Sequence, residues 1–161
     1  MTVLEINDVK GFMAKLLASD TFDDYYILEA VITKANTFTI DGRLNEEYLA
    51  DAGEDVTDLT AFRFQAWGKV RSLCFDLVKG KTLPIFMKVV LQLPESKVAD
   101  ILAESGASIR PEEITGLYLN ITYDRKELRV VTGTSLKTFS MDKSLEREWD
   151  EAAGKIMAEY M

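Results

Sequence analysis

The chain has 161 residues, of which 47% are hydrophobic and 29% are charged, and its formal net charge is −8. This balance is typical of a folded globular domain and excludes a disordered or fibrous chain. The acidic excess disfavours broad binding to nucleic acid or to anionic lipid, although it leaves room for one local basic patch. At this length we expect a single domain over residues 1–161.

The chain contains no histidine and a single cysteine, Cys74. It therefore lacks the commonest general base and the commonest ligand of transition metals, and one thiolate does not make a zinc site. We expect no metal and no cofactor, and we favour a non-catalytic role over an enzyme. The lone cysteine indicates a reducing compartment. The sequence also shows no signal peptide and no apolar run long enough to span a membrane. Together these features predict a cytoplasmic protein without membrane contact.

In the first half, the alternation of polar and apolar residues predicts strand, helix, strand, strand and helix. Asn7 or Asp8 has the side chain of a helix cap, and Gly80 stands where a glycine commonly ends a helix. The last of these helices is predicted to bury Trp67 and Cys74 on one face. The predicted elements are a strand at 2–6, a helix from 7 or 8 to 19, strands at 25–33 and 37–40, an acidic loop with one helical turn at 45–58, and a helix at 60–79.

The second half predicts the same order of elements. Pro94 fits the first turn of a helix, and the polar residues 124–127 join two alternating strands as a hairpin. Gly133 indicates a bulge or a strand end. The predicted elements are a strand at 85–93, a helix from 94 to 106, strands that begin at 117 and 128, and a helix from 142 or 144.

The two halves also share residues. Residues 3–10 (VLEINDVK) resemble residues 90–97 (VLQLPESK), and a similar strand precedes Gly42 and Gly133. The sequence therefore predicts an α+β fold, a mostly antiparallel sheet with packed helices, from the internal duplication of a strand–helix–strand–strand–helix unit. The pseudo-repeats would span about residues 1–80 and 85–161. A coincidental likeness, which any α+β protein can show, is the alternative.

Residues 62–88 carry six basic residues and one acidic residue, a net charge of +5 in a chain whose remainder carries −13. Cations beside aromatic rings are what proteins use to bind single-stranded nucleic acid, so Arg63, Lys69 and Arg71 form a candidate nucleic-acid site. We favour the alternative, in which these charges cover the solvated side of a helix whose other side packs Trp67 into the core.

A second candidate site, for an anion or small ligand, joins a helix end with two strand ends. If the halves are repeats, the turn at 41–43 corresponds to residues 132–135, and the two strand ends can flank one shared groove. Each segment also has a simpler explanation, as a turn, a helix end or a threonine-rich edge strand. The candidate residues are Asp41, Arg43, Lys79, Lys81, Thr134, Ser135 and Lys137.

Carboxylates supply a further alternative, a hydrolase or transferase that uses Asp41 with Asp23, Asp24 or Glu29. This hypothesis requires a cleft in which one of the carboxyl groups has a raised pKa. Cys74 lies on the apolar face of its predicted helix, and we expect it to be an unreactive core residue.

Five strings carry a resemblance to a known family. They are 36–43 (NTFTIDGR), 77–84 (LVKGKTLP), 131–139 (VTGTSLKTF), 143–146 (KSLE) and 148–150 (EWD). Over nearly its full length the chain resembles an uncharacterised family of small cytoplasmic proteins from clostridia and their relatives, a domain of unknown function. The resemblance implies no activity and no residue roles.

A second resemblance concerns topology alone. Processivity clamps that encircle DNA are built from repeated strand–helix–strand–strand units, are acidic overall and turn basic helices toward the DNA. This likeness implies a nucleic-acid-associated role for residues 62–88, but the helix after each strand pair departs from the clamp pattern, and fold alone is weak ground for function. We favour a non-catalytic binding or interaction module that takes a protein partner or a small anionic ligand.

Overall fold

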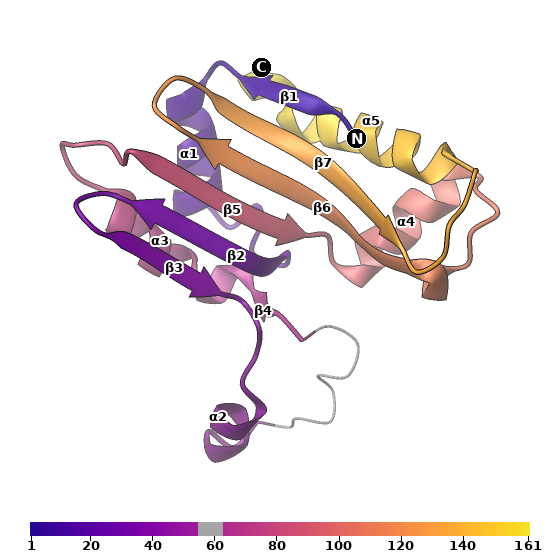
Figure 1. The fold of residues 1–161 in the computed structure, drawn as a ribbon, viewed down its shortest axis with the longest axis horizontal. Coiled ribbons are helices and arrows are strands. Elements are labelled where there is room, and N and C mark those ends of the chain that lie inside the picture. The colour runs from indigo at the N-terminus through magenta and orange to yellow at the C-terminus, as the bar shows by residue number, and fades with distance from the viewer. Residues whose placement is uncertain (55–62) are drawn as a thin grey trace.

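The computed structural model describes residues 1–54 and 63–161. Its centre is one antiparallel sheet in the order β1-β7-β6-β5-β2-β3, with a short β4 paired to β2 (Figure 1). The predicted α+β class with a mostly antiparallel sheet is confirmed. The strands are β1 (Val3–Ile6), β2 (Tyr26–Thr33), β3 (Thr37–Asp41), β4 (Gln65–Ala66), β5 (Phe86–Gln92), β6 (Ile114–Tyr123) and β7 (Leu128–Leu136).

The helices that pack on the sheet lie behind it in Figure 1, whereas α2 projects away from the sheet. None of the helices in the described ranges is long and apolar enough to cross a membrane. The helices are α1 (Val9–Ala18), α2 (Glu46–Asp51), α3 (Arg71–Val78), α4 (Glu95–Ser105) and α5 (Ser144–Met157), with 3-10 turns η2 (Trp67–Lys69), η3 (Pro111–Glu113) and η4 (Ala158–Tyr160).

Alternation along the strands places the core on one face of the sheet. On β6, Leu117, Leu119 and Ile121 are almost fully buried, whereas Tyr118 and Asn120 between them are only half-buried. Residues two apart on a strand share a face, so the odd-numbered residues of β6 contact the helices and the even-numbered ones lie on the other face. Sheets of this kind are apolar on one side and mixed on the other.

Local signals define the ends of several helices. The Asp8 side chain accepts a hydrogen bond from the Gly11 backbone N–H at 3.0 Å, so the predicted cap of α1 is confirmed. Pro94 lies one position before the predicted first turn, as the residue that precedes α4, and Gly106 ends that helix with φ of 66°. In α5, side chains four residues apart form a buried stripe, namely Leu145, Trp149, Ala153 and Met157.

The continuous helix predicted at 60–79 is wrong. In its place the chain forms β4, η2 and α3 in succession, and residues 60–62 lie outside the described ranges. The Trp67 N–H donates to the Tyr25 carbonyl at 2.7 Å and the Gly68 N–H donates to the Asp23 carbonyl at 3.1 Å. These distant backbone bonds replace the helical ones, yet Trp67 and Cys74 are both fully buried as predicted.

Two further expectations need correction. Gly133 neither bulges nor ends its strand, because β7 continues to Leu136 and the register shift lies on the partner strand, between Ile114 and Gly116. The acidic segment at 45–58 is more helical than predicted, since α2 fills most of its first half; residues 55–58 lie outside the described ranges.

The second half has the predicted order of helices and strands, β5-α4-β6-β7-α5, whereas in the first half α2 and β4 lie between β3 and α3 of the predicted order β1-α1-β2-β3-α3. The first strands of the two units pair differently. Strand β5 lies between β2 and β6, whereas β1 pairs with β7 at the edge of the sheet as far as the described residues show. The internal duplication therefore stays a prediction.

Candidate functional site

The structure places the predicted anion-site residues at opposite ends of the sheet. Because neighbouring strands are antiparallel, β3, β5 and β7 all finish at one end, which we call the groove end. Asp41, Arg43 and Lys137 lie there. Lys79 lies at the other end, which we call the turn end, because its carbonyl accepts from Lys34 Nζ at 3.4 Å just after β2 finishes.

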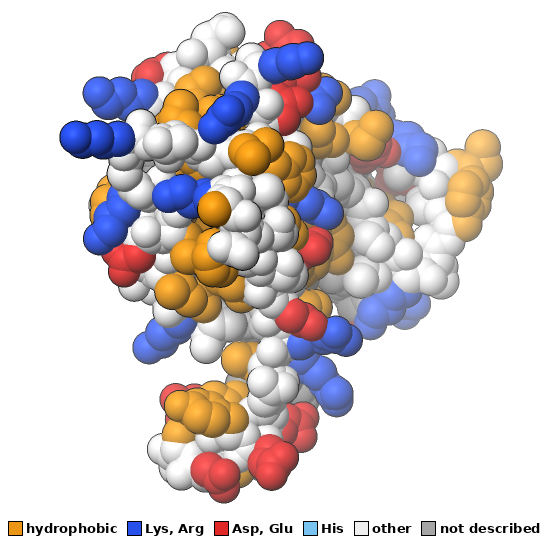
Figure 2. Space-filling model, turned by 60° about the vertical axis from the view of Figure 1, so that its left-hand side comes forward, with side chains coloured by type: hydrophobic (Ala, Val, Ile, Leu, Met, Phe, Trp, Pro, Cys, Tyr) orange, Lys and Arg blue, Asp and Glu red, His pale blue; other side chains and the backbone are white. Residues whose placement is uncertain are grey.

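Lys81 is also at the turn end, in the segment that leads from α3 into β5. In Figure 2 the left-hand side of Figure 1 comes forward, and Lys and Arg side chains are scattered there among hydrophobic ones.

Residues 134 and 135 belong to the last part of β7. Thr134 shares a row with buried Leu117, and its buried hydroxyl has no hydrogen-bond partner among the described residues, so it faces the core.

Asp41 and Arg43 satisfy each other. Arg43 Nη2 lies 2.6 Å from Asp41 Oδ2, and Arg43 Nε lies 3.1 Å from each carboxylate oxygen. Hydrogen bonds from the Arg43 side chain and backbone lower the pKa of Asp41 to about 2. An exposed carboxylate with a lowered pKa stays ionised at neutral pH, so Asp41 does not fit a general acid.

The other carboxylates of the hydrolase hypothesis are also paired with cations. Glu29 lies opposite Asp41 in the register of β2 and β3, and its carboxylate is 3.2 Å from Lys88 Nζ. Asp24 pairs with Lys97 at 3.2 Å, and Asp23 pairs with Arg71. Across residues 1–54 and 63–161, no three Cys, Asp or Glu side chains gather closely enough to hold a metal ion.

Arg71 of the predicted nucleic-acid site is part of the protein's own structure. Its guanidinium donates to both carboxylate oxygens of Asp23, at 2.7 and 3.0 Å, and to the carbonyl of Leu17 at 3.4 Å. The Trp67 indole N–H donates to the Leu16 carbonyl at 3.0 Å. These carbonyls belong to the last turn of α1, where no intrahelical donor remains. Trp67 and Arg71 therefore close the end of α1, and buried Trp67 presents no ring to a base.

Replacing Arg71 with alanine is expected to lower the free energy of unfolding by about 1.5–3 kcal/mol, because charge-assisted hydrogen bonds are lost and Asp23 remains unpaired. Urea unfolding followed by circular dichroism measures the change. The exposed neighbour Lys69 is the matched control, and Lys69→Ala should shift the value by no more than about 0.5 kcal/mol. Equal, small effects of both substitutions would contradict a structural role for Arg71.

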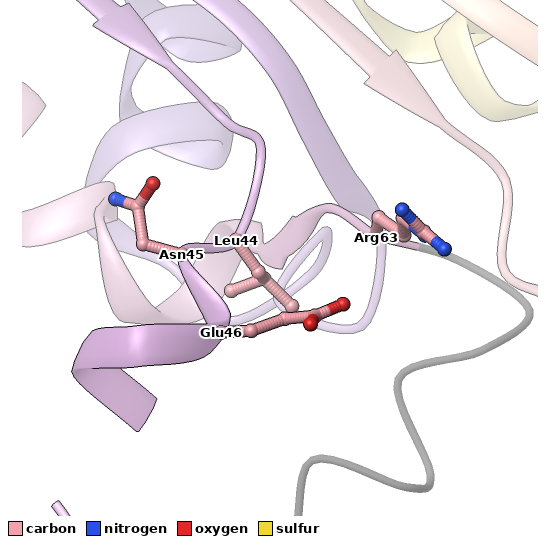
Figure 3. Close-up of a pocket in the computed structure, with 4 residues that line it drawn as sticks. All are labelled: Leu44, Asn45, Glu46 and Arg63. Atoms are coloured by element: carbon pink, nitrogen blue, oxygen red, sulfur yellow. The ribbon is translucent and has the colours of Figure 1, made fainter. Parts of the chain in front are cut away.

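Arg63 borders a small hollow of about 340 Å³. Figure 3 shows Glu46 and Arg63 extending to the same side of Leu44 while Asn45 points the other way. Of the four described lining residues only Leu44 is apolar, and no ion pair joins Glu46 to Arg63. The hollow therefore has little apolar surface with which to desolvate a ligand.

A larger groove, with a volume of about 910 Å³, lies at the groove end of the sheet. Gln92 of β5 and Gly116 and Tyr118 of β6 line it from the sheet, and an apolar stripe of α4 lines it from the side. No residue of α4 is fully buried, although its apolar side chains pack partly against the core. The stripe of α4 that faces the groove consists of Val98, Ala99 and Leu102.

Both register shifts of the described sheet lie at this groove. Strand β2 shifts between Ile27 and Glu29, and β6 shifts between Ile114 and Gly116. Leu28 and Thr115 have no paired residue opposite them at these shifts, and both line the groove. Bulges turn side chains away from the regular alternation and are over-represented beside functional sites.

Gly116 keeps the floor of the groove free for two polar groups. A Cβ at this position would lie 2.6 Å from the Tyr118 hydroxyl oxygen and 3.0 Å from the Gln92 amide nitrogen. The hydroxyl and the amide therefore converge above the glycine. The amide donates to the Thr115 carbonyl at 3.4 Å, whereas the Tyr118 hydroxyl makes no hydrogen bond within the described residues. Burial raises the pKa of Tyr118, so the phenol keeps its proton as a donor.

The comparisons with known proteins identify the family but no activity. A family model described as "Family of unknown function (DUF5721)" matches residues 15–161. The chain belongs to this family. The resemblance to an uncharacterised family is thus confirmed, while its clostridial range stays a prediction. No curated protein and no solved structure matches the chain.

Because membership of DUF5721 brings no residue roles, the candidate site rests on geometry. Of the residues predicted from the sequence, only Lys137 lines the groove. Gln92, Gly116 and Tyr118 were missed. Gly116 stands directly before an alternating strand, and a glycine there indicates that another group approaches the backbone closely. The sequence does not show which residue approaches, nor that a groove lies there.

Proposed function

We propose that the protein is a non-catalytic binding module and that the groove at the ends of β5 and β6 is its binding site. The observation that carries this proposal is the Tyr118 hydroxyl, a donor without a protein partner on the floor of an apolar-walled groove. A volume of about 910 Å³ falls in the range of small-molecule sites, which have mostly apolar walls and a few convergent polar groups.

The hydroxyls of the lining support a binding role. The hydroxyls that line the described groove belong to Thr115 and Tyr118, and neither donates to a base. Cys74 is fully buried, and burial raises the pKa of its thiol to about 11. A buried thiol with a raised pKa is inert. The same unpaired cysteine is the basis on which we assign the protein to a reducing compartment, the cytoplasm.

Filling the groove tests this function. Ala99 is an exposed residue of α4 that lines the groove, so Ala99→Trp should block the groove without disturbing the core. The probe is 1-anilinonaphthalene-8-sulfonate, which has an apolar body and one anionic group. We expect its fluorescence titration to show binding by the parent protein and at least tenfold weaker binding by Ala99→Trp.

Two variants control for other effects of the substitution. Glu104→Trp adds the same side chain to α4 at an exposed position that does not line the groove and lies on the other side of the helix from Ala99, and it should bind the dye like the parent. Phe139, 89% exposed, is the most exposed large apolar side chain of the described residues, so Phe139→Ser removes a site for non-specific dye binding. Equal dye binding by the two tryptophan variants would exclude the groove as the site.

A further inference from the structure

Two opposite charges without ion-pair partners flank the groove. Lys137 follows β7 and Glu95 begins α4, directly after β5, and both line the groove. Neither side chain forms an ion pair with any described residue, although twelve ion pairs occur among the described residues. An unpaired cation and an unpaired anion at one apolar groove are complementary to a ligand that carries both charges.

The surroundings of Lys137 explain why it is unpaired. Its backbone N–H donates to the Glu113 carbonyl at 2.7 Å, so η3 lies beside it. The two carboxylates of η3 are both engaged by Arg110, with Glu112 at 3.7 Å and Glu113 at 3.3 Å. Among the described residues, the Lys137 ammonium therefore has no ion-pair partner.

Glu95 lies at the start of a helix and has no cation beside it among the described ion pairs. It is the first residue of α4, where the partial positive charge of the helix N-terminus stabilises a carboxylate. The nearby Lys97 is already paired with Asp24 and lies 4.8 Å from the centre of the Tyr25 ring.

The sheet sets the separation between the two charges. Strand β6 lies between β5 and β7, and neighbouring strands are about 4.8 Å apart, so the strand ends that precede Glu95 and Lys137 lie about 10 Å apart across the sheet. An extended peptide spans about 3.3–3.6 Å per residue. Three or four residues therefore reach from one charge to the other.

We propose that the groove binds a free peptide of three or four residues, with its terminal carboxylate at Lys137 and its terminal ammonium at Glu95. This inference rests on the proposed function of the groove. The apolar stripe of α4 contacts the ligand's side chains, and the Tyr118 hydroxyl donates to a backbone carbonyl of the peptide. The bound peptide thus supplies a partner to Lys137, to Glu95 and to the Tyr118 hydroxyl.

Calorimetric titration with capped peptides tests the proposal. The probes are Leu-Phe-Leu, its N-acetyl form, its C-terminal amide and the doubly capped form. Removal of either terminal charge is expected to weaken binding at least tenfold. Leucine peptides of two, three, four and six residues form a second series, and affinity is expected to be highest at three or four residues.

Neutral variants assign each terminus to its residue through a double-mutant cycle. In Lys137→Met, amidation of the C-terminus should cause no further loss, whereas N-acetylation still weakens binding tenfold. In Glu95→Gln the pattern should be reversed. Lys126→Met is the matched control, because Lys126 is exposed in the β6–β7 turn at the other end of the sheet and forms no ion pair among the described residues.

The outcomes separate this inference from the proposed function. If the dye binds and Ala99→Trp abolishes its binding, but capped and uncapped peptides bind equally or not at all, the dipolar peptide is wrong and the groove remains the site. If neither dye nor peptide distinguishes the parent from Ala99→Trp, both proposals fail. Both proposals would be established if the tenfold loss of affinity on amidation disappeared in Lys137→Met and the tenfold loss on N-acetylation disappeared in Glu95→Gln.

Discussion

Gly42→Ala is expected to lower the free energy of unfolding by about 3 kcal/mol, the upper end of the usual cost of overpacking and a large part of the stability of a folded protein. A Cβ on Gly42 would lie 1.7 Å from the Ile27 carbonyl oxygen. The obstacle is backbone, so no rotation of a side chain relieves the overlap. The end of β3 must instead move away from β2. Urea unfolding followed by circular dichroism measures the loss.

The same glycine joins two walls of the groove. Its N–H donates to the Leu28 carbonyl at 2.9 Å, and its carbonyl accepts from the Gln65 N–H at 2.8 Å, next to Phe64. Leu28 and Phe64 both line the groove. Any Gly42→Ala protein that still folds should therefore bind 1-anilinonaphthalene-8-sulfonate more weakly than the parent.

Gly154→Ala is the matched control for this change. Gly154 lies inside α5, and nothing approaches within 4 Å of the position its Cβ would take. Alanine there should raise the free energy of unfolding by about 0.5–1 kcal/mol, because glycine weakens a helix interior. If the free energy of unfolding of Gly42→Ala came within about 1 kcal/mol of the parent value, the close approach of β3 to β2 would be wrong.

The elements that the sequence predicted well are those whose signal is local. The alternation in β6 and the four-residue spacing of buried side chains in α5 follow from which neighbours along the chain are apolar. The Asp8 cap likewise depends on a bond within one turn, to Gly11. Such signals are visible in one sequence, because both partners lie within a few residues.

The failure at 60–79 has the opposite cause. Helical periodicity around Trp67 and Cys74 indicated one helix, and both residues are buried as that periodicity requires. The backbone at 65–68, however, is bound to residues 23–27, about forty positions earlier. Tertiary hydrogen bonds of this kind override local preference, and no pattern within the segment reports them.

The candidate site depended on information of the same distant kind. The sequence pointed to strand ends as ligand-binding segments and included Lys137 among them. It also joined Lys79 and Lys81 to that site, although the antiparallel order of the strands places them at the turn end. The groove further requires two register shifts and the approach of Tyr118 to Gly116, which depend on pairing across the sheet.

Trp67→Ala is expected to lower the free energy of unfolding by about 3–5 kcal/mol, since the side chain is fully buried and its removal leaves a cavity. Trp67→Phe keeps most of the apolar volume but leaves the Leu16 carbonyl without its donor, so we expect a loss of about 1–3 kcal/mol. Urea unfolding of both variants measures the two terms separately.

The same pair of variants decides between the core and nucleic-acid interpretations of the basic segment. A ring that stacks on bases contributes about 1–3 kcal/mol to binding and little to folding. With Trp67 packed against the end of α1, both variants should lose stability, and the parent should show no salt-sensitive binding to a single-stranded oligonucleotide. The nucleic-acid interpretation makes the opposite prediction. Trp67→Ala would then leave the free energy of unfolding unchanged, and the parent would bind the oligonucleotide in a salt-sensitive way. Trp67→Ala and Lys69→Ala would both weaken that binding.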